Sequence, residues 1–129
     1  MIIIKELRTT KKEEIIDITD IVVREVSERK VQEGRCLVFI PHTTAGVTIN
    51  ENADPSVKQD ILHGLRSMNF ESMDFLHAEG NSPAHIKTAI VGNSADIIIS
   101  GGKLLLGTWQ GIYFCEFDGP RTRKFMMQF

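Results

Sequence analysis

The carboxyl-terminal part of the chain, residues 96–129, reads DIIISGGKLLLGTWQGIYFCEFDGPRTRKFMMQF and decides the fold class. Its apolar runs are separated by three short segments rich in turn-forming residues, at 101–102, 108–110 and 118–120. Such segments between apolar runs are typical of strand connections. The pattern predicts four strands, at about 96–100, 103–107, 111–117 and 123–129, joined in order as a meander.

The amino-terminal half adds further strands. Apolar runs at about 2–8 and 13–18, joined by a polar turn at 9–12, predict a hairpin. Residues 36–40 are apolar without alternation, which predicts a central strand covered on both faces and ended by Pro41. From Gly46 the apolar and polar residues alternate, so the next strand has one polar face.

Three helices are predicted between these strands. The first is capped by Thr19 or Asp20 and ends before Gly34. The second spans about 55–67, after the capping pair Asp54-Pro55, and the third begins at Ser82-Pro83. Strands at both ends with helices between them indicate an α+β fold, largely antiparallel, and 129 residues fit a single domain, 1–129.

Composition excludes several classes of protein. The chain has 15 Lys and Arg against 17 Asp and Glu and no long basic run, which argues against nucleic acid as a partner. No segment resembles a signal peptide or a membrane span, so we expect a cytoplasmic protein without a membrane partner. Cys36 and Cys115 lie in apolar runs and are expected to be buried thiols. The apolar strand at 123–129 predicts a subunit interface.

The four histidines differ in their surroundings. His63 falls on the polar face of the second helix and is expected to be exposed. His42 follows the strand break at Pro41, whereas His77 and His85 flank the start of the third helix. A histidine in the first turn of a helix is favoured in its neutral form, which a metal ligand or a hydrogen-bonding catalyst requires. The spacing of His77 and His85 does not match the zinc signature of helices, so a metal site would need folding to bring His42 to them.

Other polar residues are candidates as well. Ser82 is expected to cap the third helix, whose start, preceded by Gly80-Asn81, offers backbone donors to an anion such as phosphate. Arg121 either grips a phosphate or pairs with Asp118. Glu116 lies on an otherwise apolar strand face and is either at a strand end or functional. Helix capping explains Asp54 but does not explain Glu51.

Three segments, 41–52, 77–85 and 107–121, together resemble the YjbQ family, also called the secondary thiamine-phosphate synthase family. The resemblance implies an α+β domain, a homotrimer, and a site formed by the motif histidines and acids. It also implies a weak activity that joins hydroxymethylpyrimidine diphosphate to thiazole phosphate and releases pyrophosphate. The catalytic residues expected on this basis are His42, His77, His85, Glu51 and Glu116.

Two functional hypotheses and one structural alternative follow. The first is an enzyme acting on phosphate or diphosphate substrates, with thiamine phosphate synthesis as its activity and a divalent metal ion, zinc or magnesium, held by His42, His77 and His85. The second is a non-catalytic trimeric module that binds a metal or a small phosphorylated metabolite. In both, the residues expected to bind phosphate are Asn81, Ser82 and Arg121. The structural alternative treats the histidines as loop residues satisfied within a trimer.

Overall fold

The computed structural model describes residues 1–129 and contains eight strands, three α-helices and one short 3-10 helix. No helix combines the length and the apolar character needed to cross a bilayer. The strands are β1 (Ile2–Arg8), β2 (Glu14–Asp17), β3 (Gly34–Phe39), β4 (Ala45–Glu51), β5 (Ser94–Ser100), β6 (Lys103–Leu104), β7 (Gln110–Glu116) and β8 (Thr122–Gln128). The helices are α1 (Thr19–Glu28), α2 (Ser56–Ser67), the 3-10 helix (Phe70–Ser72) and α3 (Ser82–Val91).

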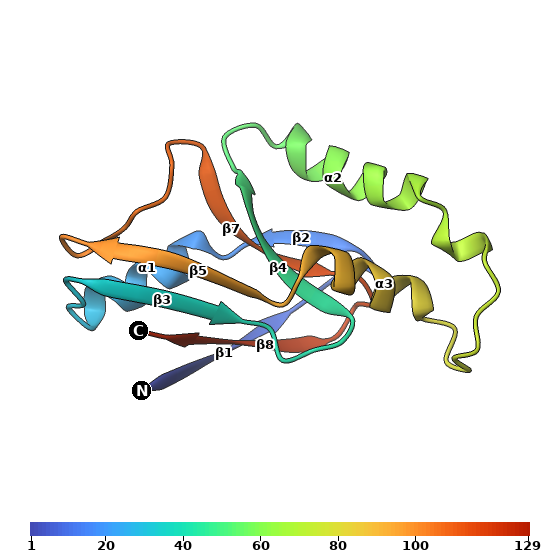
Figure 1. The fold of residues 1–129 in the computed structure, drawn as a ribbon, viewed down its shortest axis with the longest axis horizontal. Coiled ribbons are helices and arrows are strands. Elements are labelled where there is room, and N and C mark those ends of the chain that lie inside the picture. The colour runs from blue at the N-terminus through green and yellow to red at the C-terminus, as the bar shows by residue number, and fades with distance from the viewer.

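The strands form two antiparallel sheets (Figure 1). The larger sheet has the order β1-β8-β3-β5-β6 and the smaller one has the order β2-β7-β4. Both chain ends belong to the larger sheet, where Ile2 lies opposite Gln128. The predicted α+β class with three helices and antiparallel strands is confirmed.

Two of the predicted strand pairings are wrong. The amino-terminal strands do not form a hairpin, because β1 pairs with β8 in one sheet and β2 with β7 in the other. The backbone N–H of Thr9 donates to the carbonyl of Arg121, so the chain leaves the larger sheet where the turn was expected. The carboxyl-terminal meander is also interrupted. Only β5 and β6 pair directly, whereas β7 lies in the smaller sheet and β8 returns between β1 and β3.

The main core lies between the two sheets and includes the inner face of α1. The expectation that the strand at 36–40 is covered on both faces is wrong. β3 is covered on one face only, since Leu37 and Phe39 remain 36% and 37% exposed. β7 is the strand that is buried on both faces. The buried apolar residues of this core are Ile3, Ile18, Val22, Val26, Cys36, Val38, Ile40, Ala45, Val47, Ile97, Ile99, Ile112, Phe114, Phe125 and Met127.

A second apolar cluster attaches α2 and α3 to the outer face of the smaller sheet. Leu65 of α2 and Ala84 of α3 pack with Tyr113 and Phe117 from the β7 region. α3 also lies close to β4. A Cβ atom on Gly46 would collide with the carbonyl oxygen of Gly92, which accepts the N–H of Val47. This contact fixes the position of α3, which carries part of the candidate site.

The helix starts differ slightly from the predicted caps. Asp17, rather than Thr19 or Asp20, supplies the accepting oxygen at α1, where its carboxylate accepts the N–H and hydroxyl of Thr19. At α3 the capping residue is Asn81 instead of Ser82, and its carbonyl accepts the N–H of His85. His85 nevertheless lies in the first turn of α3, as expected.

Candidate functional site

A polar cleft of about 370 Å³ lies where the β3–β4 loop, the start of α3 and the turn between β7 and β8 meet. Apart from Pro41, the side chains that line it are polar or charged. We call it the histidine–arginine cleft. It is lined by Pro41, His42, Thr43, Thr44, His77, Glu79, Asn81, His85, Arg121 and Arg123. The three predicted histidines are therefore brought together by the fold.

His42 is held in a defined orientation by a backbone donor. Its Nε2 accepts the N–H of Lys124 at 2.9 Å, so this nitrogen carries no proton. Burial, followed by the positive charge of Arg123, lowers the pKa of His42 below its ordinary value. In a neutral ring whose Nε2 is an acceptor, the proton resides on Nδ1. His42 therefore has one hydrogen-bond donor left for a ligand.

His77 and His85, which also line the cleft, lie against each other. Their ring centroids are 5.2 Å apart in an edge-to-face arrangement. His77 is exposed in the connection before α3, and its Nε2 is 3.9 Å from the carboxylate of Glu79. His85 is half-buried on α3. The pair forms a polar wall of the cleft.

This arrangement does not fit the expected metal site. No group of three or more His, Cys, Asp or Glu side chains is placed to hold a metal ion. The Nε2 lone pair of His42 is already used by Lys124. A zinc or magnesium ion bound by His42, His77 and His85 stays a prediction that the geometry does not favour.

A buried ion pair forms the floor of the cleft. Arg123 donates from Nε to Glu116 Oε2 at 2.8 Å, and its Nη2 also binds Glu116 and the side chain of Thr44. The hydroxyl of Thr9 and the N–H of Asp118 donate to the same carboxylate. Burial alone would raise the pKa of Glu116, but these donors outweigh it and lower that pKa, so the group is ionised.

These contacts change the interpretation of Glu116. Its carboxylate is fully buried and points toward Arg123, and it does not line the cleft. Glu116 therefore positions Arg123. Arg123 itself was missed in the sequence, although a signal was present: it alternates with Phe125 and Met127 on the inward face of β8. A charge on such a face needs a buried partner.

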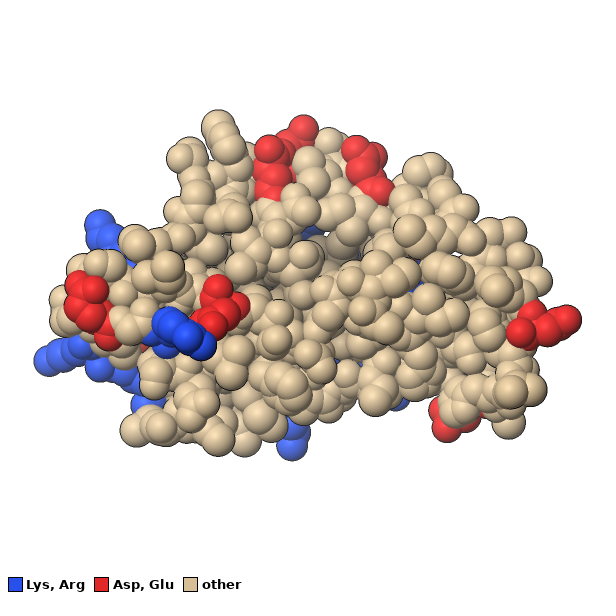
Figure 2. Space-filling model, in the orientation of Figure 1, with Lys and Arg blue, Asp and Glu red and all other residues tan.

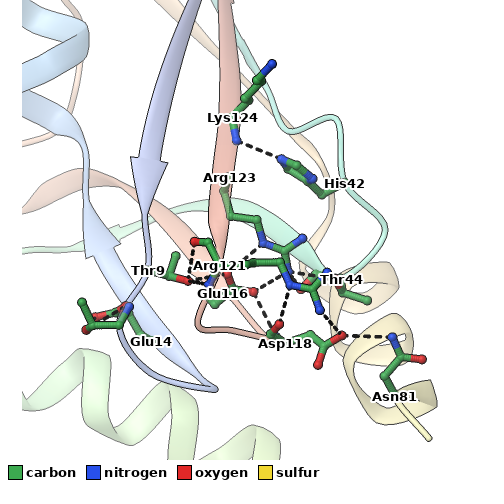
Figure 3. Close-up of polar contacts among 11 residues, drawn as sticks. Thr9, Glu14, His42, Thr44, Asn81, Glu116, Asp118, Arg121, Arg123 and Lys124 are labelled. Atoms are coloured by element: carbon green, nitrogen blue, oxygen red, sulfur yellow. Dashed lines mark hydrogen bonds and ion pairs between the residues drawn. The ribbon is translucent and has the colours of Figure 1, made fainter. Parts of the chain in front are cut away.

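Arg121 forms the second ion pair of the cleft. Its Nε donates to the backbone carbonyl of Asp118 at 2.8 Å and its Nη2 to the Asp118 carboxylate at 3.0 Å. The amide of Asn81 donates to the same carboxylate. The pairing of Arg121 with Asp118 is thus present, and Nη1 of both Arg121 and Arg123 has no partner in the protein. Figure 3 shows the two guanidinium groups between His42 on one side and Asp118 and Asn81 on the other.

Two other predicted site residues, Glu51 and Ser82, lie outside the cleft, as does His63, which was not expected there. Glu51 is at the far end of β4, opposite Gln110, and the six-residue rise from Ala45 places it about 20 Å along the strand. Ser82 lines a neighbouring pocket that also contains Lys87. His63 is exposed on α2, as expected. The cleft therefore contains only part of the predicted set.

The fold and the cleft define a class of protein: an α+β domain of two antiparallel sheets with one polar, arginine-bearing cleft at the start of a helix. The family model described as "UPF0047 protein YjbQ-like" matches residues 4–129. The chain belongs to this family. A UPF0047 protein of Methanocaldococcus jannaschii is 54% identical over 123 residues, covering 95% of this chain and 89% of that protein. The UPF0047 protein YugU of Bacillus subtilis is 52% identical over 119 residues, covering 92% and 90%.

Solved structures show the same fold. A protein of the YjbQ/UPF0047 family from Clostridium acetobutylicum superposes with a TM-score of 0.94 at 54% identity, covering 98% of each chain. A protein from Sulfolobus solfataricus superposes with a TM-score of 0.93 at 31% identity, covering 98% of this chain and 94% of that one. The latter is described as a YbjQ-like protein of unknown function.

The activity expected from the resemblance is corrected by these comparisons. The matching family is described only as UPF0047, YjbQ-like, and the relatives carry the same description. None of these descriptions contains thiamine phosphate synthesis or another transferase reaction, and the Sulfolobus protein is described as of unknown function. The expected thiamine-phosphate synthase activity is therefore wrong. The hypothesis of a non-catalytic binding module agrees better with the descriptions of the family and its members.

Proposed function

We propose that this chain is a binding module for a small phosphorylated metabolite, which it holds in the histidine–arginine cleft. The observation that carries the proposal is the pair of guanidinium groups, Arg121 and Arg123, each fixed by a carboxylate and each with a free Nη1. Guanidinium groups match the oxygens of a phosphate in geometry and charge. Donors that are already oriented lose little conformational entropy when a ligand binds.

The other lining groups are suited to the same ligand. The Nδ1 proton of neutral His42 is a further donor at the cleft. The start of α3 adds the positive end of a ten-residue helix, which favours an anion. The carboxylates of Glu116 and Asp118 offset the charge of the two arginines, so hydrogen-bond geometry contributes more than net charge to the recognition of the ligand.

A phosphate titration tests this proposal. We expect inorganic phosphate to bind the wild-type protein in isothermal titration calorimetry, and Arg121→Gln to weaken binding by about tenfold, the effect of one charge-assisted hydrogen bond. Arg24→Gln is the matched control, because Arg24 is exposed on α1 and does not line the cleft. Absence of phosphate binding, or equal losses in the two variants, would overturn the proposal.

The same experiment distinguishes direct binding of phosphate by the arginines from binding through a metal ion. Under the proposal, phosphate binding is the same with a chelator and with added zinc or magnesium. If binding requires one of these ions, the ligand is held through a metal and the arginine-based proposal is wrong.

We further propose that the protein is cytoplasmic and assembles with copies of itself, as a homotrimer. Both cysteines are free and buried, which suits a reducing compartment.

The support for self-association is the uncovered face of the larger sheet, on which Ile2, Ile4, Leu37 and Phe39 are exposed. Such an apolar patch is typical of a subunit interface.

A further inference from the structure

A second pocket of about 410 Å³ adjoins the histidine–arginine cleft and shares three of its lining residues, His42, Thr43 and His85. Its remaining lining is Thr88, Ala89, Gly92 and Asn93, from the carboxyl-terminal part of α3 and the link to β5. We call it the neutral pocket. A ligand held by its phosphate in the cleft can extend past His42 and His85 into this second space.

The neutral pocket differs from the cleft in its chemistry. It contains no Asp, Glu, Lys or Arg, and Ala89 is its single apolar residue. In Figure 2 the surface over α3 likewise carries almost no charged side chains, which gather at one end and along the rim of this face. The side chains of Thr43 and Asn93 are exposed and make no hydrogen bond within the protein. The pocket offers neutral donors and acceptors.

The strongest single observation is the hydroxyl of Thr88. Thr88 is 8% exposed and lines the neutral pocket, and its Oγ1 is buried without any hydrogen-bond partner. A threonine on a helix commonly donates to a carbonyl of the preceding turn, and this one does not. A buried polar group left unpaired costs about 1–3 kcal/mol, so a partner from outside the chain is expected.

From the proposed function and these features together we infer that the ligand is a phosphate ester of a neutral polyhydroxylated group, such as a polyol or a sugar. Its phosphate occupies the histidine–arginine cleft and its hydroxyls occupy the neutral pocket, where one of them pairs with Thr88 once rotation of that side chain turns its buried hydroxyl toward the pocket. Hydroxyl groups donate and accept, so they match the mixture of threonine, asparagine and histidine side chains. A cationic substituent finds no carboxylate there, and an aromatic one finds Ala89 as the single apolar side chain.

A third pocket, which shares His77 and Asn81 with the cleft, is less suited to this part of the ligand. It is lined by four carboxylates, Glu13, Glu71, Asp74 and Asp118, against the two lysines Lys12 and Lys87. Lys87 is fully committed to Glu13 and Glu71, each at 2.8 Å. The neutral pocket is therefore the favoured extension of the cleft.

Calorimetry with four probes tests the inference: inorganic phosphate, glycerol phosphate, phosphoethanolamine and phenyl phosphate. We expect glycerol phosphate to bind the wild-type protein about five- to tenfold more tightly than inorganic phosphate, the effect of about one net hydrogen bond. Phosphoethanolamine and phenyl phosphate have no such advantage. Thr88→Val, which replaces the hydroxyl with a methyl group of similar size, is expected to abolish the advantage and to leave inorganic phosphate binding unchanged.

Two further variants keep the result interpretable. Thr108→Val is the matched control, since Thr108 is exposed in the turn before β7 and lines neither pocket. Asn93→Ala removes a second polar group of the neutral pocket and is expected to reduce the advantage as well. Thermal unfolding should show that Thr88→Val melts no lower than the wild type, because it removes an unpaired buried hydroxyl.

The outcomes separate the inference from the proposed function. If inorganic phosphate binds but glycerol phosphate has no advantage, or keeps it in Thr88→Val, the neutral pocket is not a polyol site and only the inference fails. If phosphoethanolamine or phenyl phosphate binds best, the chemical class is wrong. If none of the four probes binds, the proposed function fails with it.

Discussion

Glu116 and Arg123 show how much one residue pair matters to the cleft. Removing one member of a buried ion pair leaves the other charge without a partner, which costs about 3–5 kcal/mol. Glu116→Gln is therefore expected to lower the free energy of unfolding by about this amount, as measured by urea denaturation, because Arg123 is almost fully buried. Glu6→Gln, at an exposed position on β1, is the control and should change little. Equal midpoints for both variants would show that the pair is unimportant for stability.

His42 gives a pH dependence whose direction follows from its lowered pKa. As the pH falls, the unfolded chain protonates His42 near pH 6.5, whereas the folded protein resists protonation, because burial and the positive charge of Arg123 lower the pKa of His42. The contribution of neutral His42 to stability is thus complete above about pH 6.5 and declines as the pH falls from there toward the lowered pKa.

The measurement compares wild type with His42→Gln. The difference in their free energies of unfolding should be largest near pH 8 and shrink as the pH falls to about 5.5, within the window set by the ordinary pKa. The comparison cancels the titration of the carboxylates, which both proteins share. A difference that stays constant with pH, or an NMR titration that gives His42 an ordinary or raised pKa, would contradict the prediction.

Individual residues also show what could and could not be predicted from the sequence. The exposure of His63 follows from helical spacing and is confirmed. The meeting of His42 with His77 and His85 depends on loops that are 35 or more residues apart in the chain. Glu51 is expected at the site from the family resemblance, yet it lies at the other end of β4. Distance along a strand, rather than residue type, decides which polar residues meet.

At the level of elements, the contact between β4 and α3 holds the cleft together. Gly46 allows the two backbones to approach, since any Cβ there would collide with the carbonyl oxygen of Gly92. We expect Gly46→Ala to lower stability by about 1–3 kcal/mol, the usual cost of overpacking, and to weaken phosphate binding because α3 is displaced.

Gly64→Ala is the matched control for this substitution. Gly64 lies in α2, where an added Cβ meets nothing within 4 Å, and alanine favours a helix over glycine. Chemical denaturation should show a gain of about 0.5–1 kcal/mol for Gly64→Ala against a loss for Gly46→Ala. A neutral or stabilising Gly46→Ala would mean that the β4–α3 contact is loose.

For the whole molecule, the exposed face of the larger sheet, with two rows of mostly apolar residues, is the main feature without a partner. Ile2, Gln128 and Leu37 form one row across β1, β8 and β3, and Ile4, Met126 and Phe39 form the next. The ion pair between Arg35 and Asp96 lies beside them on β3 and β5. An apolar centre beside charged groups is typical of an interface between subunits, and a second copy of this chain is the proposed occupant.

Phe39→Asp tests this surface. A buried aspartate at the centre of a subunit contact is expected to dissociate the assembly, so light scattering should change from a trimer to the 14.5 kDa protomer. Val23→Asp is the control, because Val23 is exposed on α1, away from this sheet face. Circular dichroism should show that both variants fold. A monomeric wild-type protein, or a trimeric Phe39→Asp, would show that this face does not join the subunits.

The sequence by itself determined the number and kind of the strands and α-helices, the α+β class, and the place of His85 in the first turn of a helix. These follow from local periodicity and turn chemistry, which act over a few residues. Only the tertiary structure decided that β1 and β2 enter different sheets, that β7 leaves the meander, and that Arg123 rests on Glu116. These outcomes depend on which strands pair and which charges are buried together, and such contacts are fixed by burial between residues far apart in the chain.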